Sequence, residues 1–137
     1  MTPSPSFGTS SLLVALGGGL GTALRYGVGR WAIAVLGPGF PFGTFAVNII
    51  GGFLMGLLAG WLARMSTGNT GGAEELRLLL GVGVLGGFTT FSAFSLQTLR
   101  LIQEGDWARV AGNVLLSVGL GLFAAALGYR LARGLAG

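Results

Sequence analysis

The stretch GGFTTFSAF, from Gly86 to Phe94, places glycine, hydroxyl and aromatic residues inside a long apolar segment. A glycine pair followed by Thr-Thr favours a departure from helical geometry, which frees backbone carbonyls from their helical partners. Freed carbonyls can coordinate a hard cation such as Na⁺. Phe91 and Phe94 are three residues apart, so on a helix they share a face and can turn their electropositive ring edges toward an anion. The stretch therefore predicts an ion site, with simple packing of the two rings as the alternative.

Two further polar series occur in apolar segments. Asn48 is followed at four-residue steps by glycines, and Asn113 is followed in the same way by Ser117 and Gly121. Residues four apart on a helix share a face, so each series is expected to point at one neighbouring helix. The two asparagines are predicted either to bridge helices or to line an ion path.

The polar groups expected within the membrane are almost all neutral. The four acids, Glu74, Glu75, Glu104 and Asp106, are placed in loops, and Arg25 is the one charge expected to be buried. Neutral donors with a positive helper suit a small anion better than a cation. The donors are Asn48, Thr89, Thr90, Ser92, Ser95, Asn113 and Ser117.

The residue types also exclude other classes of function. The chain contains no cysteine and no histidine, which removes thiol chemistry, histidine acid–base catalysis and the commonest transition-metal ligands. An enzyme is therefore not expected. The basic residues, all arginine, fall near the ends of apolar segments as membrane anchors do, so nucleic acid is not expected as a partner.

The elements that must position these groups are membrane helices. The 137 residues are 52% hydrophobic and 9% charged, which is far outside the range of soluble domains. Four segments are long enough to span a bilayer, at about 11–36, 42–63, 76–103 and 107–132. We predict one all-α membrane domain over 1–137, with its third helix broken at mid-membrane and with GPGFPFG, STGNTGG and QEGDW as the connections.

The arginines are balanced across the predicted membrane. Arg64, Arg77, Arg130 and Arg133 fall on the side of the termini, and Arg25, Arg30, Arg100 and Arg109 fall on the opposite side. Membrane orientation follows the asymmetry of basic residues between loops, so four against four predicts insertion in both orientations. Opposed copies can then pair as an antiparallel, dual-topology homodimer.

Three stretches, taken together, resemble the bacterial CrcB/Fluc fluoride channels. They are GGGLGTALRYGVGR (17–30), PFGTFAVNIIGGFLMG (41–56) and GGFTTFSAFSLQTLR (86–100), and the resemblance covers essentially the whole chain. It implies an antiparallel homodimer with two fluoride pores and a structural Na⁺ at the dimer centre, bound by the carbonyls of Gly86 and Thr89. It also implies pore rings at Phe91 and Phe94 and a pore amide at Asn48. Ser92, Ser117 and Arg25 match family positions, whereas Asn113 and Gln97 stand where the family commonly has tyrosine and glutamate.

Passive export of fluoride is the predicted function, in a multi-pass protein of the bacterial inner membrane that contacts lipid. Neither an ATP-binding motif nor a carboxylate within a predicted span supports active coupling. The alternative is a small four-span multidrug or cation transporter of the dual-topology type. A helix-packing subunit without transport is a third possibility.

Overall fold

The computed structural model describes residues 3–65 and 72–134, and the secondary structure within them is entirely helical. Four segments are long and apolar enough to cross a membrane: Phe7–Leu36, Phe42–Met65, Ala73–Gln103 and Trp107–Gly134. The first, second and fourth are the single helices α1, α2 and α6. The third consists of α3 (Ala73–Leu76), the π-helix η1 (Arg77–Leu85), α4 (Gly86–Phe88) and α5 (Phe91–Gln103). The predicted number of long apolar helices is confirmed, although the first begins at Phe7 rather than at 11 and the third at Ala73 rather than at 76. The predicted connection at 66–72 lies, apart from Gly72, outside the described residues.

Local signals fix most helix ends. Gly37 (φ 79°) and Gly105 (φ 73°) adopt the left-handed conformation that glycine tolerates, and they follow α1 and α5. The Asp106 carboxylate accepts from the backbone N–H of Arg109 at 3.2 Å and so caps α6. Glu74 and Glu75 lie in the first turn of α3 rather than in a loop, which corrects that part of the sequence prediction. Both suit the positive end of that helix.

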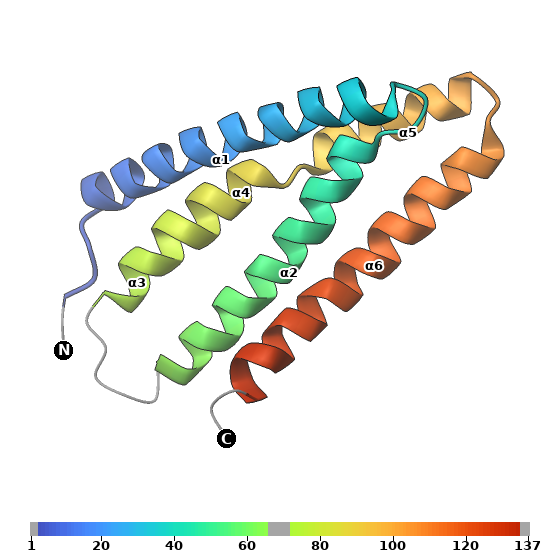
Figure 1. The fold of residues 1–137 in the computed structure, drawn as a ribbon. Helices are drawn as coiled ribbons and strands as arrows, with labels where there is room; N and C mark the ends of the chain where they lie inside the picture. The colour runs from blue at the N-terminus through green and yellow to red at the C-terminus, as the bar shows by residue number, and fades with distance from the viewer. Residues whose placement is uncertain (1–2, 66–71, 135–137) are drawn as a thin grey trace.

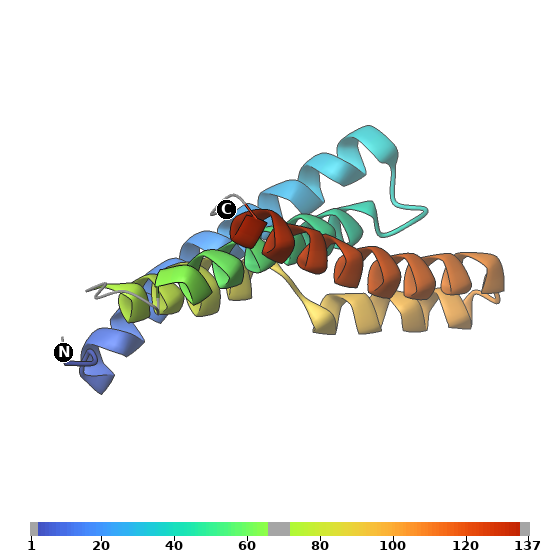
Figure 2. The same ribbon diagram turned by 90° about the horizontal axis from the view of Figure 1, so that it is seen from below.

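The four long segments run back and forth between the two ends of the molecule. Figure 1 shows both described ends of the chain at one end of the molecule, with the α1–α2 and α5–α6 connections at the other. α2 packs most extensively against α6, and α1 packs against η1 and α4. Seen from below in Figure 2, α5 and the first half of α6 extend together, away from the end of α1. The interruption before α5 therefore lies where the bundle opens.

Glycines allow these helices to approach closely. Gly52, Gly56 and Gly60 of α2 face α6, where an added Cβ would meet backbone or Cβ atoms of that helix. Gly17 and Gly21 of α1 face η1 and α4 in the same way. In lipid the hydrophobic effect does not drive helices together. Close approach of their backbones stabilises the packing through dispersion contacts instead. The predicted small-residue seam on α2 is confirmed. Asn48 lines a groove with Ser117 and Val118 of α6, and its amide also bonds to Thr90 of the third segment.

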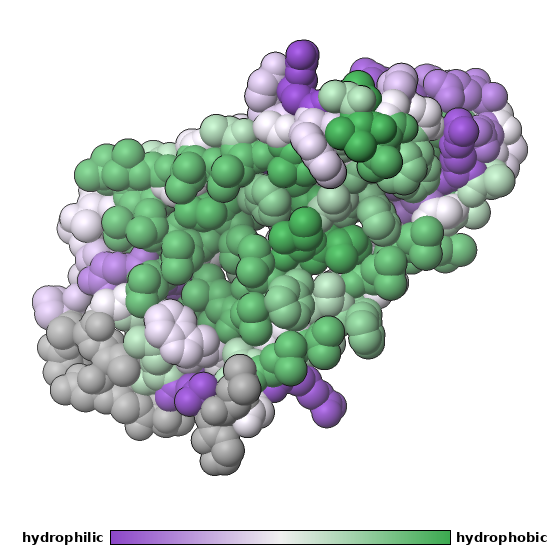
Figure 3. Space-filling view, viewed as in Figure 1, coloured by the Kyte–Doolittle hydropathy of each residue, from purple (hydrophilic) through white to green (hydrophobic). Residues whose placement is uncertain are grey.

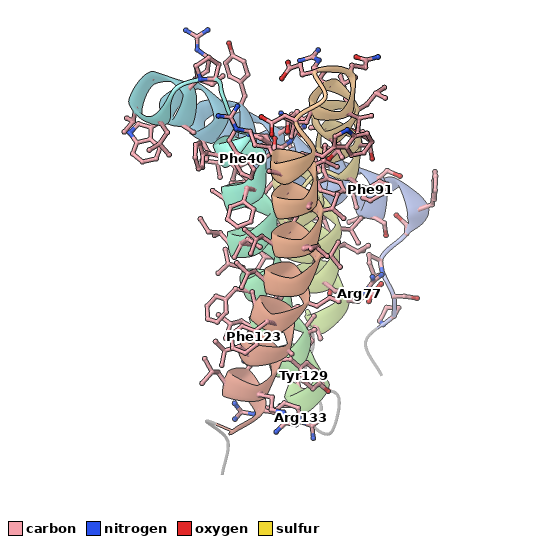
Figure 4. The ribbon with its side chains drawn as sticks, turned by 90° about the vertical axis from the view of Figure 1, so that its right-hand side faces the viewer. Phe40, Arg77, Phe91, Phe123, Tyr129 and Arg133 are labelled. Atoms are coloured by element: carbon pink, nitrogen blue, oxygen red, sulfur yellow. The ribbon has the colours of Figure 1, made fainter. Side chains whose placement is uncertain are left out.

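The outer surface is largely apolar. Figure 3 shows a broad hydrophobic face over the middle of the molecule, with hydrophilic residues gathered toward its two ends. Large side chains such as Leu16 on α1 and Leu122 on α6 are more than half exposed. Tyr129 and Arg133 lie at the end opposite Phe40 (Figure 4), where the Arg133 guanidinium donates to the Tyr129 hydroxyl at 3.2 Å. This surface suits contact with lipid.

Candidate ion site between α4 and α5

The third membrane segment leaves helical geometry at two residues. α4 ends at Phe88, Thr89 has φ −87° and ψ 157°, and Thr90 has φ −153° and ψ 120°. Helical geometry resumes at Phe91, where α5 begins. Two extended residues interrupt the backbone hydrogen-bond ladder, so each polar group around them needs another partner.

Asn48 of α2 supplies two of those partners. Its Oδ1 accepts from the Thr90 N–H at 2.8 Å, and its Nδ2 donates to the Thr90 carbonyl at 3.1 Å. One side-chain amide thus pairs with both backbone groups of the same residue. Asn48 therefore stabilises the extended conformation and, through Thr90, fixes where α5 begins.

The backbone N–H groups that would normally pair with the carbonyls of Gly86 and Thr89 are engaged elsewhere. Thr90 N–H, four residues beyond Gly86, donates to Asn48, and Ala93 N–H, four residues beyond Thr89, donates to the Thr90 hydroxyl at 3.2 Å. These two carbonyls are the oxygen ligands that a hard cation prefers. Within the described residues, no cluster of three or more acidic, histidine or cysteine side chains offers a metal site. The residues present therefore fit Na⁺ binding by backbone oxygens.

The opposite side of the interruption is the positive end of a helix. α5 has 13 residues and is capped by the Thr90 hydroxyl, which lies 3.2 Å from the Ser92 hydroxyl. The first N–H groups of a helix have no helical acceptor and carry partial positive charge. The interruption thus brings carbonyls suited to a cation next to N–H groups suited to an anion.

A groove of about 270 Å³ runs beside the interruption. The rings of Phe91 and Phe94 line it with their centroids 5.8 Å apart and their planes at 41°, and Phe91 is 79% exposed in the single chain. Figure 4 shows Phe91 just beyond the interruption. The complete lining is Asn48, Thr89, Thr90, Phe91, Phe94, Ser117 and Val118. Neutral donors and aromatic rings therefore meet on one surface, without a carboxylate.

Asn113 forms a bridge between helices, which is one of the two alternatives predicted for it. It is 1% exposed in the single chain and lies outside the groove lining. Its Nδ2 donates to the Thr98 hydroxyl at 3.0 Å, and its Oδ1 accepts from the Ser117 hydroxyl at 3.3 Å. Thr98, which the sequence did not single out, donates in turn to the Phe94 carbonyl at 2.7 Å. The only available sequence signal was its position four residues after Phe94, from which a threonine hydroxyl reaches back to a helix carbonyl.

Arg25 is half-buried rather than buried. Its Nε donates to the Gly87 carbonyl at 3.0 Å, which ties α1 to α4 just before the interruption. Among the described residues, the Gln97 Oε1 is the buried side-chain oxygen that lacks a hydrogen-bond partner. It lines a separate cavity of about 320 Å³ with Thr44, Arg100 and Glu104.

The structure therefore divides the predicted site residues into two groups. Asn48, Thr90, Phe91, Phe94 and Ser117 share the groove, together with Thr89. Ser92, Asn113, Arg25 and Gly86 lie outside its lining. Ser92 and Asn113 bond to the lining residues Thr90 and Ser117, whereas Arg25 bonds to Gly87, which is not part of the lining.

The fold defines a multi-pass membrane protein, and this groove between its helices is the candidate ion site. Residues 12–129 match the family described as CrcB-like protein, Camphor Resistance (CrcB). A protein of Novosphingobium aromaticivorans is 53% identical over 130 residues, which cover 93% of this chain and 99% of that protein. A protein of Caulobacter vibrioides is 55% identical over 111 residues, 78% of this chain and 85% of that one. Both relatives are named fluoride-specific ion channel FluC.

The chain belongs to the CrcB family. Both relatives are bacterial proteins named as an ion channel, and an ion channel is not an enzyme. With four helices long and apolar enough to span a membrane, the chain is a multi-pass bacterial membrane protein. These names favour the predicted channel over the multidrug or cation transporter.

Proposed function

We propose that this chain is the subunit of a passive fluoride-selective channel that exports fluoride across the bacterial inner membrane. The observation that carries the proposal is the groove beside Thr89 and Thr90, in a chain whose relatives are named for fluoride. Its lining combines the Asn48 amide and hydroxyl groups with the rings of Phe91 and Phe94. A small anion that leaves water needs donors of this kind in a low-dielectric path.

Each group has a distinct part in conduction. The Asn48 N–H that does not pair with Thr90 can donate to fluoride, whereas the Ser117 hydroxyl, which has one hydrogen, can do so only when that hydrogen leaves Asn113 Oδ1. The ring edges of Phe91 and Phe94 carry the positive part of the aromatic quadrupole, and the start of α5 adds partial positive charge. The anion can bind at several weak donors in turn and leave each one, as conduction requires.

The third membrane segment is proposed to be broken at mid-membrane, with the extended residues Thr89 and Thr90 facing a cavity rather than lipid. Non-helical backbone at membrane depth is tolerated only where protein or water covers it. Asn48 covers the Thr90 backbone groups from one side. The exposed apolar side chains and the balanced arginines support a second, inverted copy on the other side. We therefore propose an antiparallel, dual-topology homodimer.

Na⁺ is the proposed structural cofactor at the centre of that dimer. The carbonyls of Gly86 and Thr89 would hold it, because the backbone donors expected for them bond to side chains instead. The bound ion would supply a fixed positive charge and tie the two interruptions together. No acidic side chain among the described residues is placed to do the same.

Growth under fluoride stress tests the proposed function against the transporter alternative. Expression in bacteria that lack their own fluoride exporter is expected to restore growth in fluoride, without increasing tolerance to cationic dyes. The control is Phe94→Leu, expressed to the same level, which is expected to fail. A chain that inserts in the membrane but protects against dyes rather than fluoride would favour the multidrug transporter.

A further inference from the structure

Four polar groups form an unbroken chain of hydrogen bonds between α6 and α5. The Ser117 hydroxyl donates to Asn113 Oδ1 at 3.3 Å, and Asn113 Nδ2 donates to the Thr98 hydroxyl at 3.0 Å. The Thr98 hydroxyl donates to the carbonyl of Phe94 at 2.7 Å. The chain thus begins and ends at residues that line the groove, while its two middle members lie outside it.

Burial separates Asn113 from the ion path. It is the one polar side chain among the described residues that is fully buried, at 1% exposure, and this burial is complete within a single subunit. Association with a second subunit can only reduce exposure further. Its amide oxygen and nitrogen both have protein partners. Asn113 is therefore built as a link between helices.

The Thr98–Asn113 contact lies where it can influence the position of Phe94. α5 is separated from α4 by two extended residues, and its packing against α6 is much sparser than that of α2 against α6. Figure 2 shows α5 and the first half of α6 extending together, away from the end of α1. Where apolar packing is sparse, a buried hydrogen bond carries a larger share of the positioning. The Thr98–Asn113 contact lies one turn beyond Phe94, on the helix that carries its ring.

We propose that Thr98 and Asn113 act together as a brace that positions Phe94 at the groove, and that Asn113 is not itself a fluoride ligand. The inference rests on the proposed function, because it concerns a ring that is assigned to the fluoride path. It replaces the sequence-based expectation for Asn113 with an indirect role, and it assigns a role to Thr98.

A double-mutant cycle tests the brace. Thr98→Val removes the hydroxyl at nearly constant volume, Asn113→Leu removes the amide, and the double variant combines them. Thr98→Ser retains the hydroxyl. Ser95→Ala is the matched control, because Ser95 lies outside the groove lining although the sequence placed it among the possible donors, and it makes the same type of bond, to the Phe91 carbonyl at 3.0 Å. The measurements are fluoride efflux per reconstituted dimer, the fluoride concentration at half-maximal efflux and the melting temperature.

If the brace exists, Thr98→Val and Asn113→Leu should each lower efflux per dimer about three- to tenfold, the fold-change that corresponds to the net free energy of one hydrogen bond. Both changes break the shared Thr98–Asn113 contact, so the double variant is expected to lose less efflux than the two single losses multiplied together, although each change also removes a second bond. Thr98→Ser and Ser95→Ala are expected to stay near wild type, and the half-maximal concentration is expected not to move.

Three results would overturn the brace. One is a further, independent loss when Asn113→Leu is added to Thr98→Val, with a raised half-maximal concentration, which would make Asn113 a fluoride ligand. Another is a lower melting temperature with unchanged efflux per dimer, which would make the contact merely structural. A third is normal efflux from Thr98→Val, which decides the question even if Asn113→Leu does not assemble. Absence of fluoride efflux from the wild-type protein would instead overturn the proposed function, and the brace with it.

Discussion

Replacement of Asn48 by alanine removes both bonds that hold the extended residue Thr90. The bond from Nδ2 to the Thr90 carbonyl (3.1 Å) is worth about 0.5–1.5 kcal/mol. Loss of the acceptor at 2.8 Å also leaves the part-buried Thr90 N–H without a partner, which costs about 1–3 kcal/mol. Together they predict a loss of about 1.5–4.5 kcal/mol in the free energy of unfolding, and a melting temperature lower by several degrees.

The same variant is expected to lose fluoride efflux, because α5 is no longer fixed and a donor has left the groove. Asn48→Asp retains an acceptor for the Thr90 N–H, so it should destabilise the protein less than alanine. It should nevertheless lose at least as much efflux, because it places a negative charge on an anion path. The assay is melting in detergent beside efflux from liposomes. An unchanged melting temperature in Asn48→Ala, with efflux reduced, would refute the stabilising role of the two Asn48–Thr90 bonds and leave Asn48 as a fluoride donor only.

Four more predictions follow from the groove, the helix packing and the arginine balance. Phe91→Leu and Phe94→Leu nearly conserve volume, so each should cost about 1.5 kcal/mol or less in stability while efflux collapses; near-normal efflux from both would show that the rings only pack. Gly128→Ala places a Cβ against the backbone of α2 and should cost about 1–3 kcal/mol in unfolding free energy by thermal melting, whereas Gly119→Ala, which meets nothing within 4 Å, should be neutral or stabilising; equal effects would contradict the packing. A C-terminal tag should be accessible from both sides of the membrane, and two added C-terminal lysines should bias one orientation and impair efflux; a tag on one side only would contradict dual topology. Replacement of Na⁺ during purification should reduce dimer yield and efflux, whereas removal of the Thr89 side chain should matter less; indifference to the replacement would argue against a required central cation.

The helix ends were predictable because their signals are local. The second segment was expected at 42–63 and forms a helix at Phe42–Met65, and the fourth was expected at 107–132 and forms a helix at Trp107–Gly134. A glycine at positive φ and a capping aspartate act within a few residues of themselves. The π-helical turns of η1 were not predicted, because no local signal in the sequence marks them.

The pairings within the site were not predictable in the same way. Asn48 and Thr90 are 42 residues apart in the chain, so their contact depends on how α2 lies against the third segment. The position of Asn113 in an apolar segment was compatible with an ion path or with a bridge between helices, and only the packed structure gives its 1% exposure. Residue types could indicate which groups suit an ion, whereas tertiary contacts decide which of those groups remain available to it.

Efflux of fluoride from liposomes, measured beside chloride with the purified wild-type protein, tests the central claim most directly. We predict rapid loss of fluoride along its gradient, with no energy source and no coupled proton, and chloride retained at close to the rate of protein-free liposomes. Retention of fluoride by well-folded dimers, or equal efflux of the two anions, would contradict a fluoride-selective channel.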